Sequence, residues 1–225
     1  MATAVATEVP RTRSGRPKVP ALDTAAIAAE AKARVDAALA EAEKHPSKER
    51  TAALRALKAH PTDPDLKKAA AKALTEDRLT ALAQLEGAAD DLLIEKEAYM
   101  FRLALSLHLH EGARGVSNAI GIGREAFSKR VTKALGDEHR PLSWDESVSE
   151  LARKHRVNKY GNAATELPKV AQEVALARAL KLRIRPARNE LIKELSEQGA
   201  TRVYIAGIIG REPSRVSHIV TGRGR

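Results

Sequence analysis

The chain has 225 residues, a formal net charge of +10, no cysteine and only 3% aromatic residues. The lack of cysteine excludes a disulfide framework, a thiol nucleophile and a thiolate metal site. No apolar run approaches the roughly 18 residues of a membrane span, and the N-terminus lacks a signal-peptide core, so we expect a cytoplasmic protein. Abundant Ala, Leu, Glu, Lys and Arg favour an all-α fold with almost no strand.

The positive charge is unevenly distributed along the chain. Residues 111–225 carry 22 Lys or Arg against 13 Asp or Glu, whereas residues 1–110 carry 17 against 16. A field of this sign attracts a polyanion such as DNA or RNA, and it also fits an acidic membrane surface. Charge alone does not choose among these partners.

Residues 1–20 mix Pro, Thr and Arg with little apolar content, which predicts a flexible basic arm. Such arms can enter the minor groove of DNA, and Gly15, Arg16 and Pro17 match part of the core of an AT-hook. The other interpretation is an inert solvated tail. The candidate minor-groove residues are Arg11, Arg13, Arg16 and Lys18.

Residues 21–111 are expected to form helices that serve assembly, and we call them the assembly region. Asp23 is suited to cap a helix that runs to about Lys44. The next proline-bounded stretch predicts a shorter helix over 47–59, and a helix can resume at Asp65.

From residue 75 to 111 no proline intervenes, and small or apolar residues recur at about every 3.5 positions, which predicts one long helix. Either the preceding helices or the same helix of a second chain could bury this stripe, so an intrachain bundle and a homodimeric coiled coil are both expected alternatives. The stripe consists of Leu82, Leu85, Ala89, Leu92, Tyr99, Leu103 and Ser106.

Residues 112–140 contain the segment RGVSNAIGIGREAFSKRV, which has the spacing of two short helices around a turn. Gly121 supplies the turn, Val116 and Phe127 lie on the apolar side, and the helices are expected over about 114–120 and 124–135. The face left for solvent consists of Arg124, Glu125, Ser128, Lys129, Arg130 and Lys133.

Residues 141–185 are expected to be connecting helices. Ser143 and Glu146 form a capping box, and Trp144 is expected to fill a core position. A further helix is expected from about 168 to 182, ending before Pro186, because proline disfavours helix at the residue before it.

Residues 186–225 repeat the two-helix pattern after a lead-in helix over about 188–198. In the segment RVYIAGIIGREPSRVSHIVTG, Ala206 keeps the helices close and Gly210 supplies the turn, while Ile205 and Ile209 would face Val216 and Ile219 across the angle. The solvent face consists of Arg211, Ser214, Arg215, Ser217 and His218.

These two segments resemble the helix-turn-helix DNA-binding superfamily of bacterial and phage regulators. The downstream segment looks like the phage-repressor type, and the upstream one looks like simple bacterial regulators and the promoter-reading end of sigma factors. The resemblance implies that helices 124–133 and 211–218 lie in the major groove of double-stranded DNA. We expect Arg124, Lys129, Arg211 and Arg215 to read base edges there. Arg211 and Arg130 depart from the family pattern, which has apolar residues at their places, and an ordinary helical hairpin shares the same spacing.

No nucleotide-binding, zinc-protease or serine-hydrolase signature is present. His108 and His110 diverge by about 200° on a helix, so they cannot share a metal ion. We therefore expect no catalytic residue, cofactor or metal.

The sequence predicts a nucleoid-associated, sequence-specific double-stranded DNA-binding regulator of transcription, with repression as the expected sign. The alternatives are a plasmid or phage maintenance protein acting in partition or replication control, a sigma-like factor, and a helical adaptor for RNA or an acidic protein.

Overall fold

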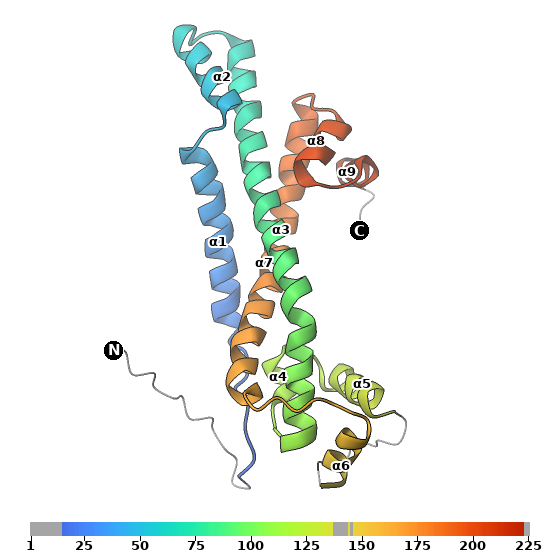
Figure 1. Ribbon diagram of the computed structural model, residues 1–225. Coiled ribbons are helices and arrows are strands. Elements are labelled where there is room, and N and C mark those ends of the chain that lie inside the picture. Colours follow the sequence, from blue (N-terminus) through green and yellow to red (C-terminus); the bar gives the residue numbers. More distant parts are fainter. Residues whose placement is uncertain (1–14, 137–143, 145, 223–225) are drawn as a thin grey trace, which may run out of the picture. The chain divides into compact units, whose positions relative to one another are not determined.

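The computed structural model describes residues 15–136, 144 and 146–222. All regular structure within these ranges is helical, which confirms the predicted all-α class (Figure 1). The elements are α1 (Thr24–Lys44), α2 (Lys48–Ala59), α3 (Pro64–Glu111), α4 (Val116–Ala119), α5 (Arg124–Leu135), α6 (Glu146–Lys154), α7 (Ala163–Glu197), α8 (Arg202–Ile209) and α9 (Pro213–Val220).

The chain forms two compact units, and each unit is built from separated segments of sequence. Unit 1 consists of residues 1–27 and 92–177, and unit 2 consists of residues 28–91 and 178–225. The long helices α3 and α7 each contribute one half to each unit. This organisation differs from the linear succession of domains expected from the sequence, because the assembly region supplies part of both cores.

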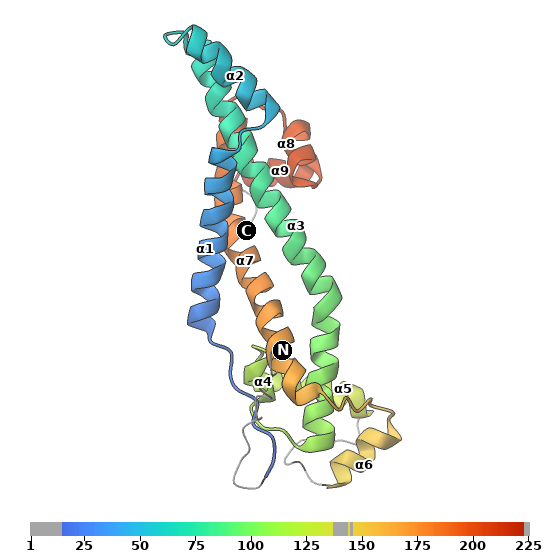
Figure 2. The ribbon, with the colours of Figure 1, turned by 60° about the vertical axis from the view of Figure 1, so that its left-hand side comes forward.

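In unit 1 the second half of α3 runs antiparallel to the first half of α7. Lys96 pairs with Glu173, and the Tyr99 hydroxyl donates to Glu166. Residue numbers therefore increase along α3 in the direction in which they decrease along α7. A tightly buried core lies between these helices and α4, α5 and α6 (Figures 1 and 2). Its fully buried members include Met100, Leu103, Leu107, Leu135 and Leu167.

In unit 2 the first half of α3 and the second half of α7 are likewise antiparallel. The Thr75 hydroxyl donates to Glu194 at 2.9 Å, and further along Arg188 pairs with Glu86. Near the start of α2, Arg50 forms an ion pair with Asp77 on α3 at 3.5 Å. Helices α8 and α9 pack on the same half of α3 through the core described below.

The apolar stripe of α3 is buried within the chain. Leu82 and Ala89 lie inside unit 2, and Leu103 and Ser106 lie inside unit 1. The chain therefore covers this stripe itself, but in unit 1 the cover comes from residues 113–174 and not from the preceding helices that the sequence predicts. The homodimer through this helix stays an untested prediction, and it would need a surface other than these four side chains.

Helix α7 begins before Pro168, where the sequence predicts a helix start, and continues through Pro186, where the sequence predicts a break between two helices. Pro186 cannot donate to the carbonyl of Leu182 one turn earlier. The Leu182 side chain is 76% exposed and Pro186 is exposed, so this strip of the helix faces water. Ile184 and Arg188 are buried on the other side and hold the helix in place.

Residues 15–20 are not the flexible arm that their composition predicts. The Val19 amide donates to the Arg114 carbonyl and the Arg114 amide donates to the Pro17 carbonyl, both at 3.1 Å. The Val19 side chain is 3% exposed, and the Arg16 guanidinium lies 4.8 Å from the centre of the Trp144 ring. We call residues 15–20 the N-terminal strap. Arg11, Arg13 and Ser143 lie outside the described residues.

Candidate nucleic-acid interface

The second helix-turn-helix lies in unit 2 and consists of α8, a turn and α9. The Thr201 hydroxyl caps α8 by accepting from the Tyr204 amide at 3.2 Å. Gly210 ends α8 with a φ of 59°, a left-handed conformation that glycine adopts without a Cβ penalty. Pro213 is the first residue of α9, where its missing N–H is harmless. The predicted turn glycine and the predicted helix-starting proline are both confirmed.

The inner faces of α8 and α9 form one apolar cluster with the two long helices. Ile205, Ala206, Ile209 and Val216 are buried as predicted, and Ile219 is half-buried. The remaining buried members are Leu79 from α3, Ile192 and Leu195 from α7, and Ala200. This core fixes which side of α9 faces outward.

The outer face of α9 carries the polar residues that the sequence predicts there. Ser214, Arg215 and His218 are exposed, and Ser217 is half-buried. The Ser214 hydroxyl donates to Glu212 at 3.3 Å. Within the described part of the chain, the Arg215 guanidinium has no carboxylate partner, so it is available to a ligand.

Arg211 lies differently from the other predicted residues of this unit. Its side chain is 47% exposed, and its Nη2 atom lies 3.6 Å from Asp90 Oδ2 and 3.9 Å from Glu86 Oε1. Both carboxylates belong to α3. Arg211 therefore faces a pair of acids rather than open solvent alone.

Tyr204 attaches the first turn of α8 to α3. Its ring centre lies 5.8 Å from the Lys72 ammonium, a cation–π contact. Burial raises the pKa of the Tyr204 phenol above its usual value, and the negative charge of Glu76 raises it further. The phenol thus stays neutral at physiological pH and serves as an anchor.

The first helix-turn-helix lies in unit 1, and its first helix is shorter than predicted. The sequence predicts helix over about 114–120, whereas α4 spans Val116–Ala119. Arg114 cannot be helical because its backbone pairs with the N-terminal strap, and Gly115 has a φ of 78°. The turn glycine is confirmed, since Gly121 has a φ of 67° and the Ile122 amide reaches back to the Ser117 carbonyl at 3.0 Å.

The second helix of this unit, α5, spans Arg124–Leu135 as predicted. Phe127, Val131 and Leu135 bury one face in the unit 1 core. Of the predicted candidates, five are exposed and Ser128 is half-buried. The exposed residues are Arg124, Glu125, Lys129, Arg130 and Lys133.

Two of the basic side chains on α5 have partners within the chain. Lys129 forms an exposed ion pair with Glu125 at 2.8 Å, a contact that solvent screens and that contributes little. The Arg130 guanidinium lies 3.5 Å from the centre of the Phe101 ring. Arg130 thus covers an aromatic face of the core, which is a structural use of a residue placed where the family pattern has an apolar one.

An open hollow of about 520 Å³ lies in the angle of this first helix-turn-helix. Its polar lining is basic or neutral, with no carboxylate. The lining residues are His108, Ala113, Arg114, Gly115, Val116, Ser117, Arg124, Phe127, Ser128 and Val131. Two guanidinium groups beside two hydroxyls suit an anionic group such as a phosphate.

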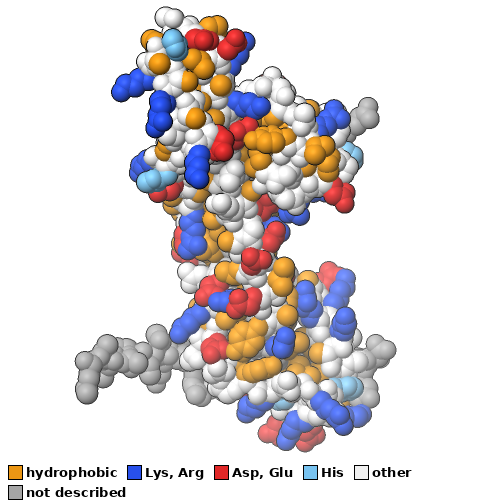
Figure 3. Space-filling view, turned by 45° about the horizontal axis from the view of Figure 1, so that its top comes forward, with side chains coloured by type: hydrophobic (Ala, Val, Ile, Leu, Met, Phe, Trp, Pro, Cys, Tyr) orange, Lys and Arg blue, Asp and Glu red, His pale blue; other side chains and the backbone are white. Residues whose placement is uncertain are grey.

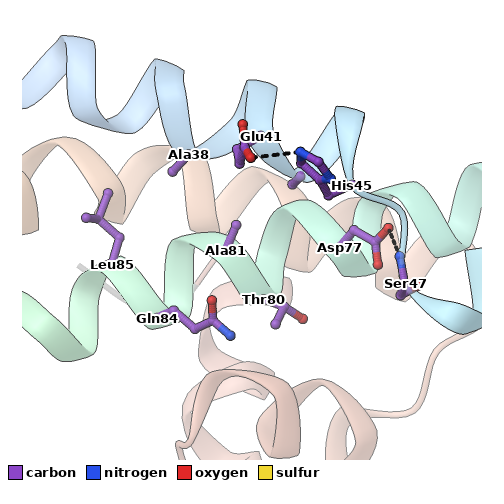
Figure 4. Close-up of a pocket in the computed structure, with 10 residues that line it drawn as sticks. Ala38, Glu41, His45, Ser47, Asp77, Thr80, Ala81, Gln84 and Leu85 are labelled. Carbon is purple, nitrogen blue, oxygen red and sulfur yellow. Dashed lines mark hydrogen bonds and ion pairs between the residues drawn. The ribbon is translucent and has the colours of Figure 1, made fainter.

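A second hollow, of about 500 Å³, lies between α1, the connection from α1 to α2, and α3 in unit 2 (Figure 4). Its charged groups are already used structurally. Glu41 pairs with His45 at 3.0 Å, and Asp77 accepts from the Ser47 amide at 3.2 Å (Figure 4). We therefore interpret this hollow as part of the packing between helices.

Both units carry an excess of positive charge. Counted over the full sequence, unit 1 has 17 Lys or Arg against 13 Asp or Glu, and unit 2 has 22 against 16. On the face shown in Figure 3, basic side chains are interspersed with acidic ones. Recognition of a polyanion would therefore depend on particular side chains more than on one continuous cationic field.

Sequence reasoning could not find the carboxylates beside Arg211. Asp90 and Glu86 lie more than 100 residues earlier, and no local pattern links them to the turn after α8. Arg114 was also missed as a candidate, although it lines the hollow of the first unit. Its only sequence signal was its position two residues before Val116, the apolar residue that starts α4.

No protein-family model, curated protein or solved structure matches this chain. Within the described ranges, no helix is long and apolar enough to cross a membrane. The same part of the chain contains no cluster of three or more side chains suited to hold a metal ion.

Proposed function

We propose that the protein binds double-stranded DNA in a sequence-specific manner through its two helix-turn-helix units and regulates transcription, with repression as the expected sign. One observation carries this proposal. In each unit the second helix buries its apolar face in the core of that unit and exposes a polar face, which carries Arg and Lys on α5 and Arg, Ser and His on α9.

The chemistry of the exposed faces supports base and phosphate recognition. Arg donates two parallel hydrogen bonds to guanine, Ser bonds bases or phosphates, and Lys neutralises phosphates. On α5 we assign base reading to Arg124 and Lys129, and on α9 to Arg215. The remaining candidates, for phosphate or secondary base contacts, are Glu125, Ser128, Arg130, Lys133, Ser214, Ser217 and His218.

Selection of bound fragments from a genomic DNA pool would yield the cognate site. Arg124→Ala and Arg215→Ala should then each weaken binding to that site by about 5- to 150-fold, the equivalent of about 1–3 kcal/mol, and weaken binding to random DNA much less. Fluorescence anisotropy at a fixed salt concentration measures both affinities.

Matched controls remove one exposed positive charge elsewhere in each unit. Lys169→Ala in unit 1 and Arg183→Ala in unit 2 should lower the affinities for cognate and random DNA by the same small factor. If Arg124→Ala and Arg215→Ala behave like these controls, the two helices do not read bases.

An adaptor that binds RNA is the second candidate, because the net positive charge of both units attracts RNA as well as DNA. Competition between duplex DNA and RNA at rising salt separates the two functions, since a true reader keeps its sequence preference as the electrostatic contribution fades. Tandem selected sites near an origin would instead indicate a maintenance protein, and copurification with RNA polymerase would indicate a sigma-like factor.

A further inference from the structure

A cluster of five charged side chains in unit 2 joins α3, α7 and the turn between α8 and α9. Glu86 and Asp90, which we call the acidic pair, project from α3. Lys181 and Arg188 approach them from α7, and Arg211 approaches them from the residue directly after Gly210.

The centre of this cluster is the buried ion pair between Arg188 and Glu86. Arg188 is 7% exposed and Glu86 is 8% exposed, and Arg188 Nη1 donates to Glu86 Oε1 at 2.7 Å. Lys181 forms an ion pair with Asp90 beside it. Buried charges persist only when they are compensated, so the position of the acidic pair is well determined by the two long helices.

Arg211 is bound to this acidic pair by charge alone. Its distances of 3.6 Å to Asp90 and 3.9 Å to Glu86 exceed those of a hydrogen bond. The contact is therefore a Coulombic one between a half-exposed cation and two carboxylates whose charge Lys181 and Arg188 already offset in part. Arg211 occupies the place after the turn glycine where related helix-turn-helix patterns have an apolar residue that seals the angle.

We infer that Arg211 is a positioning residue: its attraction to the acidic pair holds the turn against α3 and thereby orients α9. This inference rests on the proposed function for its effect on DNA. A base edge offers only partial charges, and a guanidinium that moved there would lose its proximity to the Asp90 and Glu86 carboxylates. Base reading in this unit then falls to Arg215 and its neighbours on α9.

The sign of the effect of Asp90→Asn distinguishes positioning from base reading. If Arg211 positions α9, Asp90→Asn weakens binding to the cognate site by about two- to fivefold, the range of a partly exposed ion pair. If Arg211 reads a base, Asp90→Asn releases it and binding stays the same or becomes tighter. Asp91→Asn is the matched control, because Asp91 is exposed on the same helix and its loss changes the net charge equally.

The Arg211→Lys substitution gives a second test. It keeps the positive charge near the acidic pair but lacks the rigid planar fork with which a guanidinium donates two parallel hydrogen bonds to guanine. Under the positioning role Arg211→Lys retains the cognate affinity that Arg211→Ala loses. Equal losses for the two variants would overturn the inference.

Hydrogen exchange of the DNA-free protein tests the positioning without any ligand. Amides of α8 and α9 should exchange about two- to fivefold faster in Arg211→Ala and in Asp90→Asn, and at the original rate in Asp91→Asn and Arg211→Lys. Unchanged exchange in Arg211→Ala would overturn the inference. If the unaltered chain selects no DNA fragment, the proposed function fails, and hydrogen exchange alone then decides whether Arg211 holds the turn.

Discussion

Gly112 shows how closely single residues are specified in unit 1. It has a φ of 61°, and a Cβ atom at this position would lie 2.6 Å from the Trp144 ring. The indole Nε1 donates to the Leu109 carbonyl at 2.9 Å, so the ring cannot simply move away. The close approach and the left-handed backbone both require glycine.

We therefore expect Gly112→Ala to lower the free energy of unfolding of unit 1 by roughly 2 kcal/mol or more, from overpacking and backbone strain together. Trp144 is the only tryptophan of the chain, so its fluorescence during urea unfolding reports on this unit. Gly161→Ala is the matched control, since its Cβ would meet nothing within 4 Å and its φ is ordinary. A control that is equally destabilised would show that the contact with Trp144 is not the cause.

At the scale of elements, Pro186 inside α7 lowers the free energy of unfolding of unit 2. Interior proline destabilises a helix by roughly 3 kcal/mol, partly offset by up to about 1 kcal/mol because proline restricts the unfolded chain. Pro186 is exposed, so Pro186→Ala removes no buried contact. We expect this variant to raise the free energy of unfolding of unit 2 by about 2–3 kcal/mol, measured by circular dichroism in urea.

Pro213→Ala is the comparison for this prediction. Pro213 starts α9, where its fixed φ suits the helix, so its replacement should leave stability unchanged or slightly lower. Stabilisation by both substitutions would mean that the position of the proline within its helix does not matter.

Elements with local signals were predictable from the sequence, and elements held by distant contacts were not. Asp23 caps α1 by accepting from the Ala26 amide at 2.9 Å, and Gly121 and Gly210 form the expected turns. The continuity of α7 through Pro186 depends on tertiary burial of Ile184 and Arg188, which overrides the local preference. The exposed face of α5 followed from periodicity, whereas the acidic partners of Arg211 required the fold.

At the scale of the whole molecule, neither unit is continuous in sequence. The core of unit 1 needs side chains from residues 19 to 174, and the apolar cluster of unit 2 combines Leu79 with residues 192–216. The predicted assembly region, residues 21–111, therefore cannot complete either core.

A fragment that ends at residue 111 tests this organisation. We expect it to show no cooperative thermal transition as a monomer and to self-associate through the apolar stripe of α3, whose partners from α5 and α7 are missing. Circular dichroism and analytical ultracentrifugation, run beside the full chain, measure both properties. A monomeric fragment that melts cooperatively would restore the linear domain arrangement.

The effect of proteolysis near the N-terminus should depend on whether the N-terminal strap is kept. A peptidase cut before Gly15 leaves the backbone pairing with Arg114 and the buried Val19 in place. A cut after Pro20 removes the buried Val19 side chain. It also exposes the backbone of Arg114, which lies just before the first residues of α4. Loss of residues 15–20 would thus damage the core of unit 1 beside the proposed DNA-binding helices.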